Sequence, residues 1–473
     1  DQNIENTGVA DGSEELPFTS IGEALTMSRS GHSVLIAPGH YTEAVNISGK
    51  EIILASYYLL ESDPAFIENT IIDGGGVRSA VIFDVEEEMM PSLIGFTIQN
   101  GKGAGYQGGG VTVNANSKAI LSDLIIRNNS ATSGGAVQIG ANATPILQNI
   151  RILENSAQSG GGIYLSGASP RIISCEIVNN IASNGGGVFM RSGSNPLFER
   201  TLIADNTATL NYGGGVFIAY DSKPVFSYVT FAGNEASQKS GGALYLIAGA
   251  EAVLFNSIVW NNNPDAVAGG NVGELSKLTI SNSIFENYSD SLQIDNGEIL
   301  GIDSVWTADP LFLNEALGNY YLEENSPAID KGLTYLEIDN TALYDNGSLP
   351  YDGVRPDLGA YEYDATMLNI SSEIALPSEF MMHSAYPNPF NPVITIPFSI
   401  HLRAHVTLEI YNLKGQFISR LLNTQLDAGY YKPVWNGTNH YQQTVSSGVY
   451  ILKLTAENDS QLFQASKKVV FLR

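Results

Sequence analysis

Residues 134–165 read GGAVQIGANATPILQNIRILENSAQSGGGIYL, and this stretch holds one complete unit of a repeat. Each unit opens with a Gly-Gly-small-aliphatic segment, and these segments begin at residues 108, 134, 160, 185, 213 and 241. The spacings between them are 26, 26, 25, 28 and 28 residues, and a weaker copy, GGNV, begins at Gly269. A repeat of this length without a helical segment predicts a solenoid built from short strands.

A second column of residues keeps in register with the glycines: Asn129, Asn155, Asn180, Asn206, Asn234 and Asn262. The runs between the two columns, such as PILQNIRIL, are rich in β-branched residues and too short for helices. Three short strands and three turns fill one unit, and successive coils stack at roughly 4.8 Å, so we expect about ten coils up to residue 300. Gly and Asn both tolerate positive φ, which predicts both columns at turns, with the Asn side chains hydrogen-bonded along their column.

Strand alternation assigns the side chains that follow the glycines to two faces. The predicted inward column is Val111, Val137, Ile163, Val188, Val216 and Leu244. The predicted outward column is Thr112, Gln138, Tyr164, Phe189, Phe217 and Tyr245, and the next outward column is Asn114, Gly140, Ser166, Arg191, Ala219 and Ile247. Counted back from the Asn column, Cys175 aligns with Leu124 and Ile150, which predicts a buried, unreactive thiol.

The fold class that follows is all-β, with a parallel β-helix followed by a small antiparallel Ig-like β-sandwich. The β-helix covers residues 1–363, a linker covers 364–384, and the sandwich covers 385–473, where alternating strands such as ITIPFSI and SSGVYILKL replace the repeat. Ser20–Glu23 has the pattern of a capping box, so we expect a helix there that covers the first coil.

Charge and composition limit the partners. The formal charge is −26, made of −30 on residues 1–384 and +4 on 385–473, so the acidic body repels nucleic acid and anionic lipid. The acidic body could bind Ca²⁺, so calcium is left open as a ligand. No organic cofactor is indicated. The sequence contains no run of 18 or more apolar residues, so no membrane-spanning helix is expected. The single cysteine permits no intrachain disulfide.

Three segments of the β-helix resemble known families. Residues 8–56, with GVADGSEELPFTSIGEAL and VLIAPGHYTEAV, look like the N-terminal cap of pectate-lyase-like, right-handed β-helix proteins. The GGG/Asn units look like repeats of secreted β-helix proteins and of polymorphic outer-membrane autotransporter passengers. Residues 309–363, with YYLEENSPAIDKG and DGVRPDLGAYEY, resemble the segment that closes many bacterial surface β-helix proteins.

The last 88 or so residues resemble the type A sorting domain of the type IX secretion system. The resemblance rests on YPNPFNP (386–392), IYN (410–412), Gly415, WNG (435–437), SGVY (447–450) and the end from Lys467 to Arg473. It implies export across the outer membrane, with release or surface attachment, and contact with the secretion machinery. The sequence departs from the family at His440–Thr444, where a turn glycine is usual.

Few residues suggest catalysis. The best candidate for a glycosidase pair is Glu154 with Asp205, two coils apart and near the separation of an inverting pair, and solvated turn carboxylates are the competing interpretation. All six histidines (His32, His40, His383, His401, His405 and His440) lie outside the repeats, which argues against a histidine-based site on the repeat body. Arg191 is a lone base without a visible metal site, so the metal content stays unknown.

The aromatic residues of the outward column suggest binding. Tyr164, Phe189, Phe217 and Tyr245 would form a ladder at strand spacing, suited to stacking against sugar rings or a partner protein. A purely stabilising ladder, or one covered by a loop, is the competing interpretation. We therefore expect a secreted or cell-surface adhesin, glycan-binding protein or structural subunit, with homo-oligomerisation left open. The alternative is a polysaccharide lyase or glycoside hydrolase.

Overall fold

The computed structural model describes residues 11–13, 15–105, 107–270, 272–286, 292–295, 297–301, 304–315, 318–338, 341–345, 351, 353–364, 380–382, 385, 390, 392–396, 398–426, 429–431, 433–441, 443–458 and 462–472. Most of the expected linker, His383 and most of the 386–392 segment lie outside these residues. The chain divides into two compact units, residues 1–364 and 365–473.

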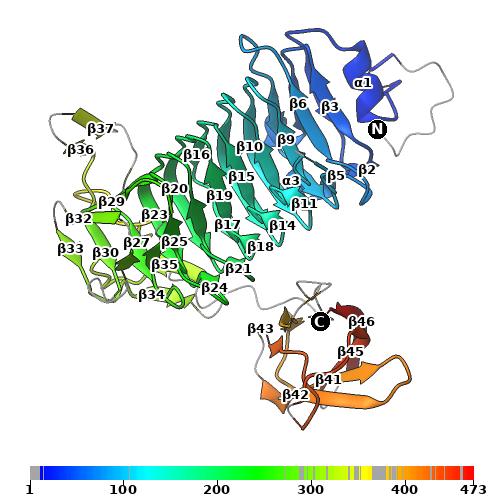
Figure 1. Cartoon of the computed structure of the whole chain (residues 1–473). Helices are drawn as coiled ribbons and strands as arrows, with labels where there is room; N and C mark the ends of the chain where they lie inside the picture. Colours follow the sequence, from blue (N-terminus) through cyan, green and yellow to red (C-terminus); the bar gives the residue numbers. More distant parts are fainter. Residues whose placement is uncertain are drawn as a thin grey trace. The chain divides into compact units, whose positions relative to one another are not determined.

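The first unit is a solenoid of parallel sheets (Figure 1). Sheet B holds ten strands in chain order: β3 (Val45–Ser48), β6 (Val81–Asp84), β9 (Val111–Val113), β12 (Val137–Ile139), β15 (Ile163–Ser166), β19 (Val188–Arg191), β22 (Val216–Ile218), β25 (Leu244–Leu246), β28 (Val267–Gly269) and β31 (Leu292–Ile294). Every pairing is parallel and joins equivalent repeat positions, such as Val137 with Ile163. The predicted coil architecture is therefore confirmed.

Sheet A contains two parallel runs that share four long strands: β10 (Ile120–Arg127), β13 (Ile146–Leu153), β20 (Leu197–Ala204) and β23 (Val225–Ala232). The first run adds β1 (Ser33–Ile36), β4 (Ile53–Ser56), β7 (Ser92–Ile94), β16 (Arg171–Ile173), β26 (Glu251–Phe255), β29 (Ser276–Ser281) and β32 (Gly297–Gly301). The second adds β2 (Gly39–Thr42), β5 (Thr70–Asp73), β8 (Thr97–Gln99), β17 (Glu176–Val178), β27 (Ile258–Trp260), β30 (Ser283–Phe285) and β33 (Val305–Trp306). The long strands bend at a residue of positive φ, for example Asn149 at 53°.

A five-stranded sheet C follows the Asn column, with β11 (Ser130–Ser133), β14 (Ser156–Ser159), β18 (Ile181–Asn184), β21 (Thr207–Ala208) and β24 (Glu235–Ala236). The asparagines form a buried ladder in which each side-chain amide donates to the next Oδ1 at 2.9–3.0 Å. The predicted ladder is confirmed, but the prediction that the asparagines themselves adopt positive φ is wrong. Positive φ belongs to the residue before each asparagine, such as Glu154 at 57° and Asp205 at 55°.

The glycines are needed because coils approach closely, as well as for positive φ. A Cβ at Gly135 would stand 2.3 Å from the carbonyl oxygen of Gly161 in the next coil. Of the Gly134–Gly135 pair, it is Gly134 that has positive φ (69°). The GGNV segment was assigned to the wrong register, because Val267 pairs with Leu244 and Gly269 with Leu246, so Gly269 ends a strand rather than opening a unit.

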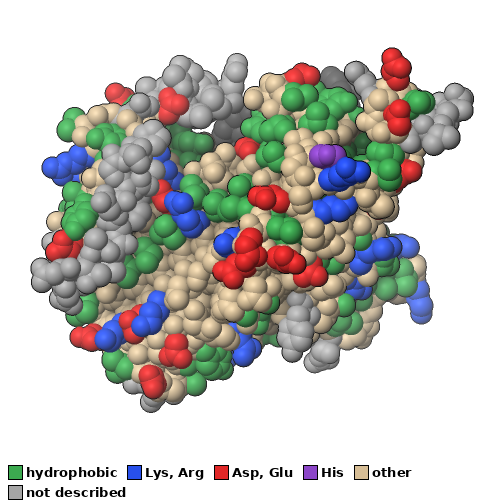
Figure 2. Space-filling view, turned by 90° about the horizontal axis from the view of Figure 1, so that it is seen from above, with side chains coloured by type: hydrophobic (Ala, Val, Ile, Leu, Met, Phe, Trp, Pro, Cys, Tyr) green, Lys and Arg blue, Asp and Glu red, His purple; other side chains and the backbone are tan. Residues whose placement is uncertain are grey.

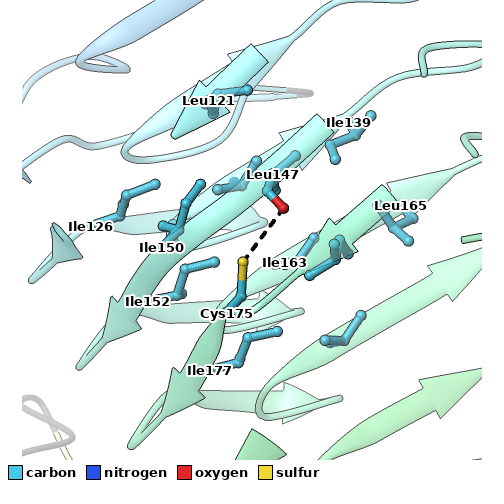
Figure 3. Packing of buried hydrophobic residues seen from close by; sticks show 14 of the residues in the cluster. Leu121, Ile126, Ile139, Leu147, Ile150, Ile152, Ile163, Leu165, Cys175 and Ile177 are labelled. Carbon is cyan, nitrogen blue, oxygen red and sulfur yellow. Dashed lines mark hydrogen bonds between the residues drawn. The ribbon is translucent and has the colours of Figure 1, made fainter. Parts of the chain in front are cut away.

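The interior of the solenoid is lined by buried apolar side chains. The predicted inward column is fully buried, and Cys175 is 1% exposed (Figure 3). Its thiol packs among Ile150, Ile152 and Ile177 and donates a weak hydrogen bond to the Leu147 carbonyl at 3.6 Å. Burial raises the pKa of Cys175 to about 12, so the thiol stays protonated and unreactive, as predicted.

Helices and a C-terminal segment cover parts of the solenoid. Helix α1 (Ile21–Met27) is capped by Ser20, whose hydroxyl accepts from the Glu23 amide, and it buries Ile21 and Leu25 against the first coils. Helices α2 (Tyr58–Glu61) and α3 (Ala65–Asn69) cover the early outer face of sheet A, where Thr97 donates to the Ile67 carbonyl.

The described residues between 310 and 364 lie on the later outer face of sheet A. They contain β34 (Phe312–Asn314), β35 (Asn319–Leu322), β36 (Tyr335–Ile338) and β37 (Thr341–Asp345). An apolar cluster joins Phe312, Tyr320 and Leu358 of this segment to Leu202, Ile258 and Ile284 of the sheet. Arg200 and Glu362 form a half-buried ion pair at 3.0 Å. The segment resembling a closing element therefore covers a side of the solenoid.

The second unit is antiparallel. Its sheets are β42-β41-β45-β46, β38-β40-β43 and β39-β44, formed by β38 (Met381–Met382), β39 (Ile394–Thr395), β40 (Phe398–Ile400), β41 (Ala404–Asn412), β42 (Phe417–Leu426), β43 (Gly429–Tyr431), β44 (Val434–Trp435), β45 (Gly448–Glu457) and β46 (Leu462–Phe471). Trp435 packs with Phe390 in its core. In the turn without the usual glycine, the Asn439 side chain accepts from the amides of Tyr441 and Gln443.

Candidate functional site

The predicted aromatic ladder exists on the outer face of sheet B. Tyr164 and Phe189 stack with ring centroids 5.4 Å apart and planes 4° apart. Phe189 stacks on Phe217 at 4.8 Å, and Phe217 contacts Tyr245 at 5.4 Å. The parallel register holds equivalent residues of successive coils beside each other, which brings residues 81 positions apart into one continuous column.

The ladder is exposed over only part of its length, so features of both interpretations left open by the sequence are present. Phe217 and Tyr245 are 7% and 6% exposed, whereas Tyr164 and Phe189 are half-buried. Tyr212 covers the later end, since its ring stacks on Tyr245 at 4.0 Å with planes 17° apart. Burial raises the pKa of Tyr245, and the neighbouring Tyr212 raises it further. Of the predicted binding residues, Tyr164 and Phe189 are the accessible pair.

A pocket of about 370 Å³ lies beside Tyr164 on the same face. Eight residues line it, contributed by four successive coils: Asn114, Ala115, Gln138, Gly140, Ala141, Tyr164, Ser166 and Arg191. Gly140 and Ser166 lie between the larger side chains of Asn114 and Arg191 in the second outward column, so the hollow forms where side chains are small. Sequence analysis placed these residues on the outer face but did not recognise the hollow between them.

Arg191 is the cation of this pocket. It is exposed, its Nε donates to Ser192 Oγ at 3.2 Å, and its guanidinium carbon lies 5.5 Å from the centre of the Tyr220 ring. These two contacts orient the side chain and leave other guanidinium N–H groups for a ligand. The pocket therefore combines an aromatic ring, a fixed cation and amide and hydroxyl groups.

Glu154 and Asp205 occupy equivalent turn positions but have different surroundings. Glu154 is exposed, while Asp205 is half-buried beside Tyr320 of the covering segment. Burial raises the pKa of Tyr320, and contact with the Asp205 carboxylate raises it further. The covering segment thus contacts one carboxylate of the pair, because the Tyr320 hydroxyl hydrogen-bonds to Asp205. The proposed catalytic pairing of the two carboxylates remains a prediction.

His40 precedes the Gly/Asn repeats and belongs to an early coil of the solenoid. It lies on β2 of sheet A, and its Nε2 is 2.9 Å from Oδ2 of buried Asp73. Asn100 and Gln99 donate to the same oxygen, and the Gly75 amide donates to Oδ1. Burial alone would raise the pKa of Asp73, but these hydrogen bonds outweigh it and lower the pKa below its usual value of 3.8.

Among the described residues, no three His, Cys, Asp or Glu side chains lie together in a way that could hold a metal ion. Within the same residues, no helix has both the length and the hydropathy needed to cross a membrane. Figure 2 shows Lys and Arg side chains as separate groups among carboxylates and uncharged atoms on one face, and not as a continuous basic strip.

Comparison with known proteins places this architecture in a family. The model for the right-handed β-helix region matches residues 61–223 and 162–305, which together span more than half of the chain. The chain belongs to the right-handed β-helix family. Residues 384–471 match the model of the secretion system C-terminal sorting domain. The two matches show a secreted or surface β-helix protein whose tail indicates export through interaction with the secretion machinery.

Other comparisons are less informative. No curated protein matches this chain. Among solved structures, dimeric latent PorU from Porphyromonas gingivalis is similar over 19% of this chain and 9% of its own, with 17% identity and a TM-score of 0.18. This chain therefore spans less than a tenth of that structure.

Proposed function

We propose that this β-helix protein acts at the cell surface or in the medium as a glycan-binding protein or adhesin. The binding site is the pocket between Asn114 and Arg191 on the outer face of sheet B. The observation that carries the proposal is the half-buried Tyr164 ring beside a hollow whose other walls are amides, a hydroxyl and an oriented guanidinium.

These groups suit a sugar ring. An aromatic face packs against the C–H face of a pyranose, while amide, hydroxyl and guanidinium groups bond its hydroxyls. The eight lining residues include no carboxylate and no histidine. General acid–base cleavage of a glycosidic bond uses such groups in pairs, so the chemistry of this lining favours binding over turnover.

The test is a binding screen of the full chain on an array of neutral and acidic glycans, followed by titration calorimetry in solution. Tyr164→Ala should weaken binding about fivefold, since stacking on an aromatic ring contributes about 1 kcal/mol. Arg191→Ala should also weaken binding, because its guanidinium lines the hollow.

Two matched variants serve as controls. Arg171→Ala removes an exposed arginine from sheet A, and Tyr441→Ala removes a tyrosine that is 72% exposed in the second unit. Both should bind like the unmodified protein. The proposal is refuted if no glycan binds, or if the two pocket variants bind as well as the two controls.

A further inference from the structure

Exposure along the first outward column changes sharply from coil to coil. Thr112 and Gln138 are buried, Tyr164 and Phe189 are half-buried, and Phe217 is buried again. Only two successive rungs of the column are therefore open to solvent at the pocket. An open surface two rungs long is short compared with the ten strands of sheet B.

The early end is closed by the backbone of the loop that ends at Gly108. The Gly108 amide donates to Thr112 Oγ1 at 3.0 Å, and that hydroxyl also contacts Ser79 Oγ at 3.1 Å. A Cβ at Gly108 would stand 2.7 Å from the Gln138 nitrogen, so the loop lies directly on the neighbouring rung. A ligand cannot follow the column past Gln138 without displacing this backbone.

The late end is closed by a local lengthening of the repeat. Five positions separate Asn155 from the next unit's Gly160, but seven separate Asn206 from Gly213. The two extra residues place Tyr212 over Tyr245, and this explains the change in unit length from 25–26 to 28 residues. The longer loop therefore blocks the column at the other end of the open rungs.

The second outward column has its own limits. Asn114 and Arg191 stand at the two ends of the hollow, and Arg191 is held in place by Ser192 and Tyr220. Three coil steps separate them, or roughly 14 Å at the strand spacing of a sheet. The volume of about 370 Å³ is near the lower end of the range for small-ligand pockets, which begins at about 300 Å³.

We infer that the pocket recognises the end of a glycan chain, one or two sugar rings long, and not an internal stretch laid along the solenoid. The inference rests on the proposed function and adds the class of epitope to it. The first column is covered at both ends, and Asn114 and Arg191 bound the hollow in the second, so additional sugar units leave the pocket toward solvent, where they contact little protein.

The length of the ligand tests this inference. Titration calorimetry on the full chain would use gluco-oligosaccharides and oligogalacturonides of one to six units, together with the shortest glycans that the array identifies. Affinity should reach its plateau at one or two units, with less than about a twofold gain from two to six units. A gain of about tenfold or more between two and six units would overturn the inference while leaving the proposed function intact.

A variant opens the late end as a second measurement. Tyr212→Ala removes the ring that covers Tyr245, so longer ligands should now bind more tightly than the two-unit ligand. A plateau that stays at two units in this variant would contradict the assigned role of Tyr212. Failure of every glycan to bind the unmodified protein is a distinct outcome, because it refutes the proposed function and removes the basis of the inference.

Discussion

Removal of one interior rung of the asparagine ladder should have a large cost in stability. Asn180 is fully buried, and its Oδ1 accepts from both the backbone amide and the side-chain amide of Asn155, each at 3.0 Å. Its own amide donates to the carbonyls of Ile152 and Val178 and to Asn206 Oδ1. Asn180→Ala removes all five bonds and strips the Asn155 backbone N–H of this acceptor.

The magnitude follows from the cost of a buried polar group without a partner, about 1–3 kcal/mol. The Asn155 N–H loses its acceptor outright and four further groups lose one bond each, so the free energy of unfolding should fall by about 3 kcal/mol. Asn262 is only half-buried at the end of the ladder, and Asn262→Ala should cost less than Asn180→Ala. The exposed Asn195 provides a control of the same residue type, with an expected cost below about 0.5 kcal/mol.

The assay is guanidinium unfolding of the full chain followed by far-UV circular dichroism. Hydrogen exchange over residues 146–184 adds a local readout, because neighbouring coils of a solenoid stabilise one another. Exchange of the Asn155 amide should accelerate in Asn180→Ala and stay unchanged in Asn195→Ala. Equal midpoints for these two variants would refute the reasoning, since the ladder would then contribute no more than an exposed side chain.

Three further outcomes are expected. Gly135→Ala should destabilise the solenoid strongly, because its Cβ would meet a carbonyl oxygen at 2.3 Å. The control Gly193→Ala meets nothing within 4 Å and should cost only about 1 kcal/mol, because of its positive φ. Thermal melts of the two variants in parallel check this order of stability. Asp73 has a lowered pKa, so its contribution should be complete above pH 3.8 and decline as the pH falls through the lowered value; unfolding at stepped pH should show the gap between the unmodified protein and Asp73→Asn shrinking only in acid. Deletion of residues 385–473 should abolish export while the solenoid still folds, and surface labelling of the truncated chain would reveal any remaining display.

The repeat carried most of the information about the fold. Gly135, Asn180 and Val188 each recur once per coil, and a stacked coil offers each position one environment, so spacing alone predicted the parallel register, the ladder and the buried column. The alternation after the glycines likewise predicted that Tyr164 and Phe189 would stack. These features depend on neighbours at a fixed sequence separation, which is why one sequence sufficed.

Contacts outside that separation were decided by tertiary structure. Tyr212 lies in a lengthened loop, and nothing in its own unit shows that its ring turns over Tyr245. Phe312, Tyr320 and Leu358 cover Leu202 and Ile258 through contacts that no repeat encodes. His40 meets Asp73 across an irregular coil of 33 residues, where the period is lost. Which residues of the aromatic ladder stay accessible was decided by contacts outside the repeat separation, such as the stacking of Tyr212 on Tyr245.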